Sequence, residues 1–234
     1  MRNFTPNARR PRLISFSGID GAGKSTQINH LCRLLRESGL RVRQLAFWDD
    51  IAMLRRSREF AAYAAFKGER GVGSPDKPVN RRDKNVRAWY LSVARAGVYF
   101  LDAISLTLRV AAISKAKADV VICDRYIYDE LANLSLNHAL SRFYARLLVK
   151  CVPAPDLAFL LDADPVQARE RKPEYPLEFL HQNRAAYLAI SRIAGMTVIG
   201  ALPAQEVADT VAALTFERLH REDAGSIVVA GNAA

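Results

Sequence analysis

Residues 18–26 have the types and the spacing that bind phosphate, and they fit the pattern G-x-x-x-x-G-K-S. Glycines in such a loop let backbone N–H groups curl around an anionic oxygen, while Lys24 can reach the β- and γ-phosphates and Ser25 can ligate Mg²⁺. An apolar stretch, Leu13–Ser17, precedes the loop, and a helical pattern over Lys24–Glu37 follows it. The positive end of that helix points at the same phosphates. The sequence therefore predicts a nucleotide phosphate site, to which we assign Gly18, Asp20, Gly21, Ala22, Gly23, Lys24, Ser25 and Thr26.

Two charged residues, Asp124 and Arg125, follow a second apolar stretch, Val120–Cys123. A carboxylate at the carboxyl end of a parallel strand beside a phosphate loop suits Mg²⁺, bound directly or through water. The neighbouring arginine can hold a phosphoryl oxygen in its planar fork. The alternative is a surface turn with an ordinary ion pair, but the strand context favours the functional interpretation.

Phosphoryl transfer requires more positive charge than Lys24 alone supplies, and the phosphate loop contains no other basic residue. A charged segment with two prolines offers Arg169, Arg171 and Lys172. We expect these residues to belong to a short mobile lid at about 169–176, with Arg169 and Arg171 as catalytic candidates. A solvated helix end is the alternative interpretation.

A long helical pattern begins near Arg81 and runs to about Lys117, and within it Arg95, Asp102 and Arg109 recur every seven residues. Positions seven apart share a helix face. This polar stripe either borders an acceptor pocket, with Arg95 on an acceptor phosphate, or is the solvated side of an amphipathic helix. The large apolar residues off the stripe are predicted to be core, namely Trp89, Val93, Phe100, Ile104 and Leu108.

Five short apolar stretches alternate with helical patterns and must position these residues. Such stretches are typical of parallel strands covered on both faces, and the alternation predicts an α/β fold with a doubly wound parallel sheet and helices on both faces. Right-handed crossovers place the loops after the strands along one edge, where ligands bind. The expected strands are Leu13–Ser17, Val42–Phe47, Val120–Asp124, Leu157–Asp162 and Thr197–Ile199.

The length of 234 residues suits one α/β domain, and we expect it over 12–222, between a basic flexible arm at 1–11 and a tail at 223–234. A glycine- and proline-rich segment, 67–78, is interpreted as a flexible connector. The net charge of +10 attracts polyanions such as nucleotides. The sequence has no long run of basic residues and no motif that combines aromatic with basic residues. It therefore gives no indication that the protein binds nucleic acid.

The three cysteines, Cys32, Cys123 and Cys151, are isolated, odd in number and without metal-ligand spacing. They predict buried free thiols in a reducing cytoplasm. The first residues lack the apolar run of a secretory signal. Charged residues interrupt the longest apolar stretch, so no membrane span is expected.

Together these segments resemble the thymidylate kinase family of P-loop nucleoside-monophosphate kinases, in order over roughly residues 12–216. The phosphate loop and two motifs that contain aspartate, Val121–Tyr126 and Leu160–Pro165, are the most specific parts. The stretch from Pro176 through Leu188 also looks like the helix that follows the lid in that family.

The resemblance implies ATP and Mg²⁺, a five-stranded parallel core and a lid that closes over the donor. It places Asp20 near an acceptor sugar hydroxyl and the donor phosphates on Lys24, Ser25 and Thr26. It puts Arg125 near the reacting phosphates and implies that a lid arginine, Arg169 or Arg171, assists. Residues 200–207 match the segment on which the family lays the donor adenine.

The acceptor side departs from the family pattern. Where the family usually shows Arg-Glu-Pro after the second strand, this chain has Phe47-Trp48-Asp49-Asp50, and Leu101-Asp102-Ala103 replaces Ala-Asp-Arg in the long helix. Arg95 or Arg109 could replace the missing arginines. The expected acceptor residues are Asp20, Trp48, Arg95, Asp102 and Arg125.

The expected function is ATP- and Mg²⁺-dependent phosphoryl transfer to a nucleoside monophosphate, dTMP to dTDP. Two alternatives stay open: a kinase of the same fold for a non-nucleotide small acceptor, and an ATP-binding protein that transfers nothing. The resemblance also allows a homodimer through the long helix.

Overall fold

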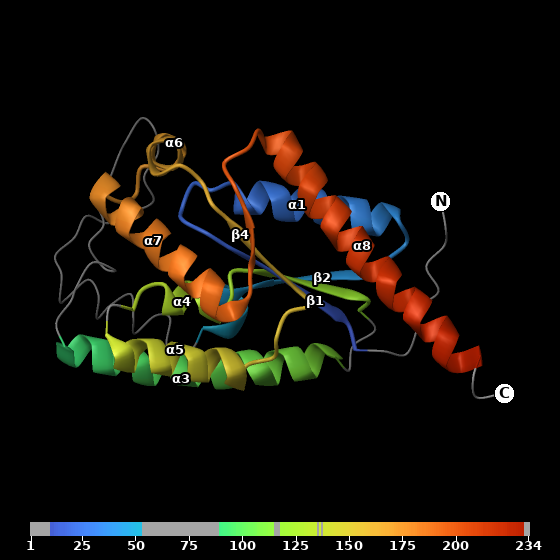
Figure 1. Cartoon of the computed structure of the whole chain (residues 1–234), viewed down its shortest axis with the longest axis horizontal. Helices are drawn as coiled ribbons and strands as arrows, with labels where there is room; N and C mark the ends of the chain where they lie inside the picture. The colour runs from blue at the N-terminus through green and yellow to red at the C-terminus, as the bar shows by residue number, and fades with distance from the viewer. Residues whose placement is uncertain (1–9, 53–88, 115–117, 135, 137, 232–234) are drawn as a thin grey trace.

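The structure is a computed structural model that describes residues 10–52, 89–114, 118–134, 136 and 138–231 (Figure 1). Five parallel strands form one sheet in the order β2-β3-β1-β4-β5. This confirms the doubly wound parallel sheet, and each strand lies within one residue of its expected bounds. The strands are β1 (Arg12–Ser17), β2 (Val42–Ala46), β3 (Val120–Asp124), β4 (Leu157–Leu161) and β5 (Thr197–Ile199).

Helices cover both faces of the sheet, as Figure 1 shows. Side chains alternate between the faces along each strand. In β1, for example, Ile14 and Phe16 pack with α1 and α8, whereas Leu13 packs with α3, α4, α5 and α7 on the other face. The helices are α1 (Lys24–Glu37), α3 (Trp89–Ser114), α4 (Ile127–Leu131), α5 (Ala139–Cys151), α6 (Pro165–Arg171), α7 (Leu177–Ala194) and α8 (Ala204–Gly231).

The end of β2 differs from the prediction, which extended this strand to Phe47. The chain instead turns into a short π-helix, η1 (Phe47–Ile51). The Asp50 carboxylate accepts a hydrogen bond from the backbone N–H of Ala46 at 2.8 Å, and this local bond stops the strand. Trp48 is thereby turned to pack edge-on against Phe47, with 5.7 Å between ring centroids.

The predicted orientation of α3 was wrong. Asp102 is fully buried, while Phe100, Ile104 and Leu108 are 51%, 43% and 66% exposed, and Arg109 is also exposed. The helix carries apolar residues all round, so its sequence does not single out one buried side. Packing against the sheet selects the side that bears Tyr99, Ala103, Leu106 and Ile113.

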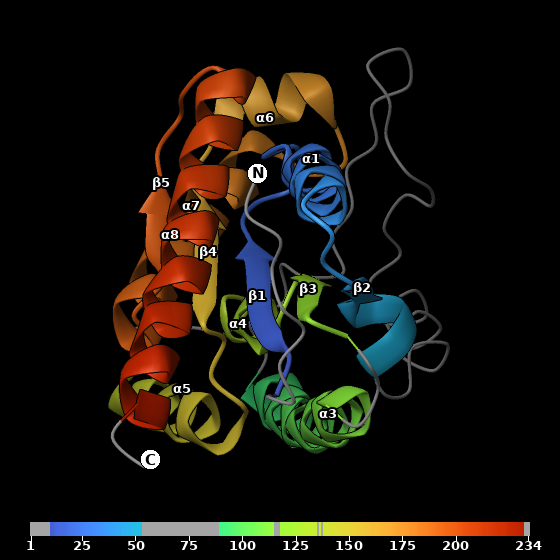
Figure 2. The ribbon, with the colours of Figure 1, turned by 90° about the vertical axis from the view of Figure 1, so that its right-hand side faces the viewer.

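One stretch of α3, Ala96–Ile113, is long and apolar enough to cross a membrane, with a mean hydropathy of 1.5. Only 22% of this window is buried. It contains two charged residues, Asp102 and Arg109, which were expected to interrupt the apolar stretch. By length and composition alone, one such helix is weak support for a span. Figure 2 shows α3 beside α5 at the bottom of the view.

The cysteine prediction holds for two of the three thiols. Cys32 and Cys123 are buried and free, but Cys151 is exposed. Cys151 is the last residue of α5, where the chain leaves the core, so its apolar neighbours in the sequence do not enclose it.

The segments at the predicted domain boundaries are partly described. Of the arm at 1–11, the structure describes Arg10, which pairs with Asp156 at 2.7 Å, and the buried Pro11. Helix α8 continues to Gly231, into the range predicted as a tail. The connector at 67–78, residues 1–9 and the side chains of Trp89 and Val93 lie outside the described residues.

Candidate active site

The phosphate loop joins β1 to α1 in the predicted geometry. Gly18, Gly21 and Gly23 have φ angles of 146°, 86° and 83°, a region that favours glycine. Lys24 is the first residue of α1 and is only 7% exposed. Its Nζ donates to the carbonyl oxygens of Gly18 and Ile19, each at 2.8 Å. The lysine is therefore held against the loop that it would serve.

The side chains that follow Lys24 are open to solvent. Ser25 and Thr26 are both exposed, so their hydroxyls are accessible to a ligand. They lie in the first turn of α1, where the helix N-terminus presents unpaired backbone N–H groups.

Burial changes the acidity of Lys24. It lowers the pKa of the ammonium from 10.5 to about 7, and the positive charge of Arg125 acts in the same direction. Asp20, Asp129 and Asp124 oppose this shift through their negative charges. An anion bound at the loop would likewise favour the charged lysine.

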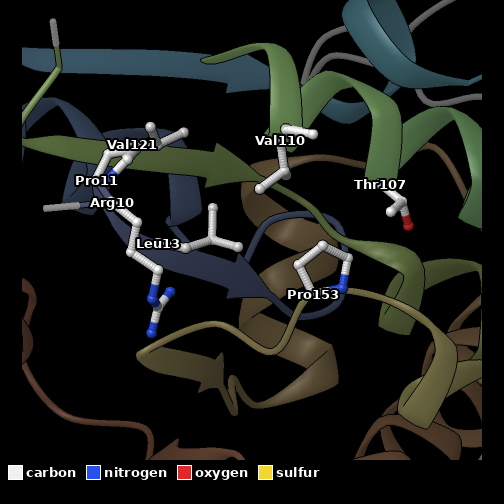
Figure 3. Close-up of a pocket in the computed structure, with 8 residues that line it drawn as sticks. Arg10, Pro11, Leu13, Thr107, Val110, Val121 and Pro153 are labelled. Carbon is white, nitrogen blue, oxygen red and sulfur yellow. The ribbon is translucent and has the colours of Figure 1, made fainter. Parts of the chain in front are cut away.

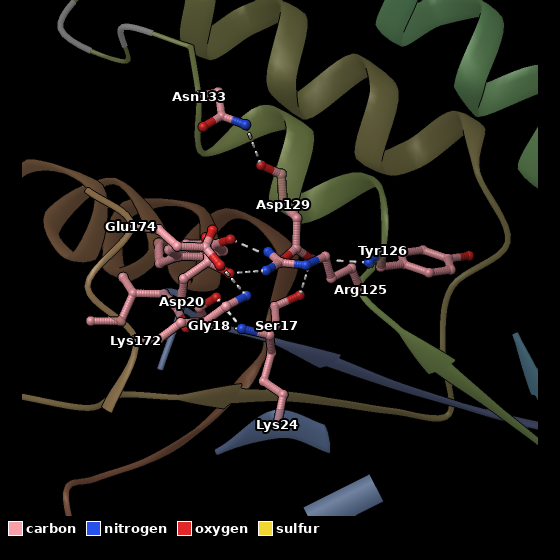
Figure 4. Close-up of polar contacts among 12 residues, drawn as sticks. Ser17, Gly18, Asp20, Lys24, Arg125, Tyr126, Asp129, Asn133, Lys172 and Glu174 are labelled. Atoms are coloured by element: carbon pink, nitrogen blue, oxygen red, sulfur yellow. Dashed lines mark hydrogen bonds and ion pairs between the residues drawn. The ribbon is translucent and has the colours of Figure 1, made fainter. Parts of the chain in front are cut away.

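Arg125 lies directly beside the loop, as predicted. Its guanidinium Nη2 forms an ion pair with Asp20, and its Nη1 donates to Asp129 Oδ1 at 3.2 Å (Figure 4). Its φ of 69° is the only positive value for a non-glycine residue in the described part of the chain. Its backbone N–H donates to the carbonyl of Phe16 in β1 at 3.0 Å, which fixes this unusual conformation.

Asp124 ends β3, in register with Phe16 of β1 and Ala46 of β2. Its side chain is half-buried at the same sheet edge as the loop, and its charge acts on Lys24. The Asp124 carboxylate and the exposed Ser25 hydroxyl are hard oxygen donors. They suit Mg²⁺, which takes one or two protein ligands together with water and phosphate oxygens.

The two arginines that were predicted to belong to a lid, Arg169 and Arg171, lie in the last turn of α6 and differ in where they point. Arg171, at the end of α6, donates from Nη1 to the carbonyl of Gly21 at 3.4 Å, so the structure brings it to the phosphate loop. Arg169 instead donates from Nε to the carbonyl of Tyr175 at 3.0 Å. Lys172 pairs with the buried Glu174 at 2.8 Å.

Two contacts fasten neighbouring helices to the site. Arg184 of α7 pairs with both carboxylate oxygens of Asp162 after β4, at 2.6 and 2.7 Å. Gln27 of α1 donates to the carbonyl of Ala204 at 2.9 Å. The second contact places the start of α8, within the predicted adenine segment 200–207, next to the helix of the phosphate loop.

The residues predicted to bind the acceptor do not all lie in one cluster. Asp20 and Arg125 lie together at the loop, and Trp48 is half-buried on η1 after β2. Asp102 is buried within α3 at 0% exposure, and the side chain of Arg95 lies outside the described residues. Their roles stay predictions.

Sequence reasoning missed Asp129, which is 2% exposed and contacts Arg125 from one helical turn away. Its spacing of four residues from Arg125 was the available signal. Two further partners, Ser17 and Tyr187, come from distant parts of the sequence and gave none.

A cavity of about 250 Å³ lies at the opposite edge of the sheet, near the amino ends of β1 and β3 (Figure 3). It contains none of the predicted site residues, so we do not assign the chemistry to it. Its lining is mainly apolar and consists of Arg10, Pro11, Leu13, Thr107, Val110, Ala111, Val121 and Pro153.

Curated relatives cover most of the chain. It is 25% identical to a probable thymidylate kinase of Archaeoglobus fulgidus over 206 residues, which are 85% of this chain and 92% of that protein. It is 27% identical to the thymidylate kinase of Solidesulfovibrio magneticus, over 85% of this chain and 96% of the relative. A probable thymidylate kinase of Pyrococcus abyssi is 29% identical, over 90% of this chain and 98% of that protein. No protein-family model matches the chain.

These relatives confirm the resemblance drawn from the sequence, and they agree with the phosphate loop and the parallel sheet. The chain is therefore similar to thymidylate kinases over most of its length, and it is a P-loop nucleotide kinase.

Proposed function

We propose that this protein transfers the γ-phosphoryl group of ATP to a nucleoside monophosphate, with dTMP as the leading acceptor. The observation that carries the proposal is the cluster of Lys24, Arg125 and Asp20 at the phosphate loop. One buried cation, one partly buried cation and one carboxylate at this edge suit a reaction in which charge develops on a migrating phosphoryl group.

The residues act by position and charge. An oxygen of the acceptor phosphate attacks the γ-phosphorus, and the bond from that phosphorus to the β–γ bridging oxygen breaks, which leaves ADP. Lys24 and the loop N–H groups bind the donor phosphates, and Arg125 neutralises the transferred group. Mg²⁺ held by Ser25, Asp124 and the nucleotide phosphates would add positive charge there.

A specific observation favours a second candidate, a kinase for a non-nucleotide small acceptor. After β2 the chain presents Trp48, Asp49 and Asp50 in place of the arginine-containing motif that is usual in thymidylate kinases, and Asp102 is fully buried within α3. The relatives are named thymidylate kinases, which supports the first candidate.

The experiment that separates these candidates is coupled ADP production with Mg²⁺ and ATP. The acceptor panel contains nucleoside monophosphates, nucleosides and phosphosugars. Turnover with dTMP well above the hydrolysis background supports the proposal. Turnover with phosphosugars alone favours the second candidate, and ATP binding without turnover on the whole panel contradicts both.

Arg171→Ala is expected to lower kcat about a hundredfold, because Arg171 is the lid arginine that reaches the phosphate loop. Arg169→Ala should cost several times less, since its guanidinium contacts the backbone of its own segment. Steady-state kinetics at saturating ATP compare the two variants. A larger loss for Arg169→Ala would reverse the assignment.

We also propose that the protein acts in the cytoplasm as a homodimer that buries the outer face of α3. Several exposed apolar side chains on one side of a helix favour an interface. Helix α5 lies beside α3 and also carries exposed apolar side chains. The exposed side chains on the two helices are Phe100, Leu101, Ile104, Leu108, Leu140, Phe143 and Leu147.

Ile104→Glu is expected to raise the dimer dissociation constant at least about tenfold, because it places a charge in that apolar patch. Sedimentation over a range of protein concentrations measures the change. Val198→Glu is the matched control, since Ile104 and Val198 are both 43% exposed and Val198 lies on β5. Equal effects of the two substitutions would contradict an interface at α3.

A further inference from the structure

We infer that Asp129 is a positioning residue that fixes one edge of the Arg125 guanidinium, and that Tyr187 ties this pair to helix α7. The inference deepens the proposed function, on which it rests for its kinetic consequence. Nothing in the sequence pattern assigned Asp129 or Tyr187 a role.

Both carboxylate oxygens of Asp129 are fully used. Oδ1 accepts from Arg125 Nη1 at 3.2 Å and from the Tyr187 hydroxyl at 2.8 Å. Oδ2 accepts from Ser17 Oγ at 2.6 Å and from the backbone N–H of Tyr126 at 3.0 Å. Only 1% of this side chain is exposed, so four donors stabilise a buried negative charge that has no freedom to turn away.

The two acidic partners of Arg125 differ in kind. Asp20 belongs to the phosphate loop, its side chain is 13% exposed, and it pairs with Nη2. A phosphate that enters the loop can therefore compete with Asp20 for this edge of the guanidinium. Asp129 cannot be displaced in the same way, because it is buried and saturated by donors. Nη1 thus stays fixed while Nη2 is available for exchange.

The backbone of Arg125 depends on the same support. A left-handed conformation at an arginine costs free energy and persists only where the surroundings hold it. Asp129 supplies part of this hold through Arg125 and Tyr126, which adjoin in the chain. Figure 4 shows Asp20, Asp129 and Lys24 gathered around Arg125.

Tyr187 connects this pair to α7. Burial, with the negative charge of Asp129, raises the pKa of the Tyr187 hydroxyl well above its ordinary value, so the hydroxyl remains a donor. One turn earlier on α7, Arg184 is held by Asp162. Two contacts on one helix thereby fix α7, which directly follows the lid segment, relative to Arg125.

The test uses Asp129→Asn in the full-length protein. Asparagine keeps the size of the side chain but removes the charge that faces Nη1. We expect kcat to fall about tenfold to a hundredfold, the value of one charged hydrogen bond, while the Kd for ADP changes less than about threefold. In an Arg125→Lys background the same substitution should change kcat less than about twofold, because its effect acts through the guanidinium.

Tyr187→Phe should lower kcat by a smaller factor, about threefold, because it removes one neutral donor and leaves the charge. Thr215→Val is its matched control. Thr215 is also fully buried, and its hydroxyl donates to the carbonyl of Val211 within α8, on the opposite face of the sheet. It should lower Tm without changing kcat.

A spectroscopic measurement makes the test independent of turnover. In protein labelled with ¹⁵N-arginine, the Nη–H signals of Arg125, identified by their loss in Arg125→Lys, should be resolved because rotation about the Nε–Cζ and Cζ–Nη bonds is restricted. Asp129→Asn should average them. This result supports positioning even if no acceptor on the panel is phosphorylated, which would defeat the proposed function alone.

Two results would overturn the inference. The first is that the Arg125 signals stay resolved in Asp129→Asn. The second is a kinetic result that does not depend on the guanidinium. Either Asp129→Asn lowers Tm while kcat stays within about twofold of the parent, or Asp129→Asn lowers kcat by the same factor in the parent and in the Arg125→Lys background. In either case Asp129 only stabilises the start of α4, where it accepts from the backbone N–H of Tyr126, the residue before the helix.

Discussion

Lys24→Ala should reduce kcat/KM for phosphoryl transfer about a hundredfold to a thousandfold. The ammonium is held by the carbonyls of Gly18 and Ile19 at the point where the donor phosphates would bind. The methyl group of alanine cannot replace this charge, and the phosphate loop contains no second basic residue. Initial-rate measurements over a range of ATP concentrations determine the loss.

The same variant should remain folded, and its stability should depend on pH differently from that of the parent. Burial lowers the Lys24 pKa from 10.5 to about 7, so the charged amine disfavours the folded state. This cost is fully present below about pH 7 and fades as the pH rises toward 10.5. Alanine removes it, and the gain in Tm relative to the parent should be larger at pH 6.5 than at pH 9.5.

Lys150→Ala is the control for loss of a lysine charge, because Lys150 is exposed on α5. It should retain parental kcat/KM. A fully active Lys24→Ala protein would contradict the assignment of the phosphate loop as the donor site.

Gly21→Ala should damage both folding and activity. A Cβ at Gly21 would lie 2.1 Å from the carbonyl oxygen of Ala168 in α6, and φ at this position is 86°. Because the clash is with backbone, either the loop or α6 must move. The backbone strain and the overpacking together should cost about 3 kcal/mol of unfolding free energy. A loop shift of about 1 Å should lower kcat about a hundredfold.

Gly39→Ala separates strain from collision. Gly39 has a φ of 84°, but nothing lies within 4 Å of a Cβ placed there. It should therefore cost only about 1 kcal/mol and leave kcat unchanged. Urea unfolding and initial rates measured on both variants make the comparison. Equal losses of stability would show that the contact with Ala168 does not constrain the loop.

Short-range signals explain how much of the fold could be predicted. The bounds of α1 and β3 match the expected Lys24–Glu37 and Val120–Asp124 because glycine turns and apolar runs mark them locally. The meeting of Asp20 with Arg125 also follows from the sequence, since parallel strands bring the ends of β1 and β3 to one edge.

Features that depend on packing could not be predicted in the same way. The buried side of α3 is chosen by its contacts with the sheet, and the apolar residues on both the buried and the exposed side of the helix hid this choice. The hydrogen bond from Tyr187 to Asp129 joins residues 58 positions apart, and the resemblance of the stretch around Tyr187 to a family helix does not indicate this partner. Such contacts exist only after the layers have assembled, so local patterns carry no record of them.

The order of the strands means that the phosphate loop takes up its structure late in synthesis, although its residues are made early. β1 is the central strand and the first to leave the ribosome, yet its two neighbours, β3 and β4, begin at Val120 and Leu157. Until both have emerged, the hydrogen-bonding edges of β1 stay unpaired and the loop has no frame. A nascent chain that ends before β4 should bind no nucleotide. Until β4 is made, the unpaired edges of β1 are accessible to chaperones and proteases.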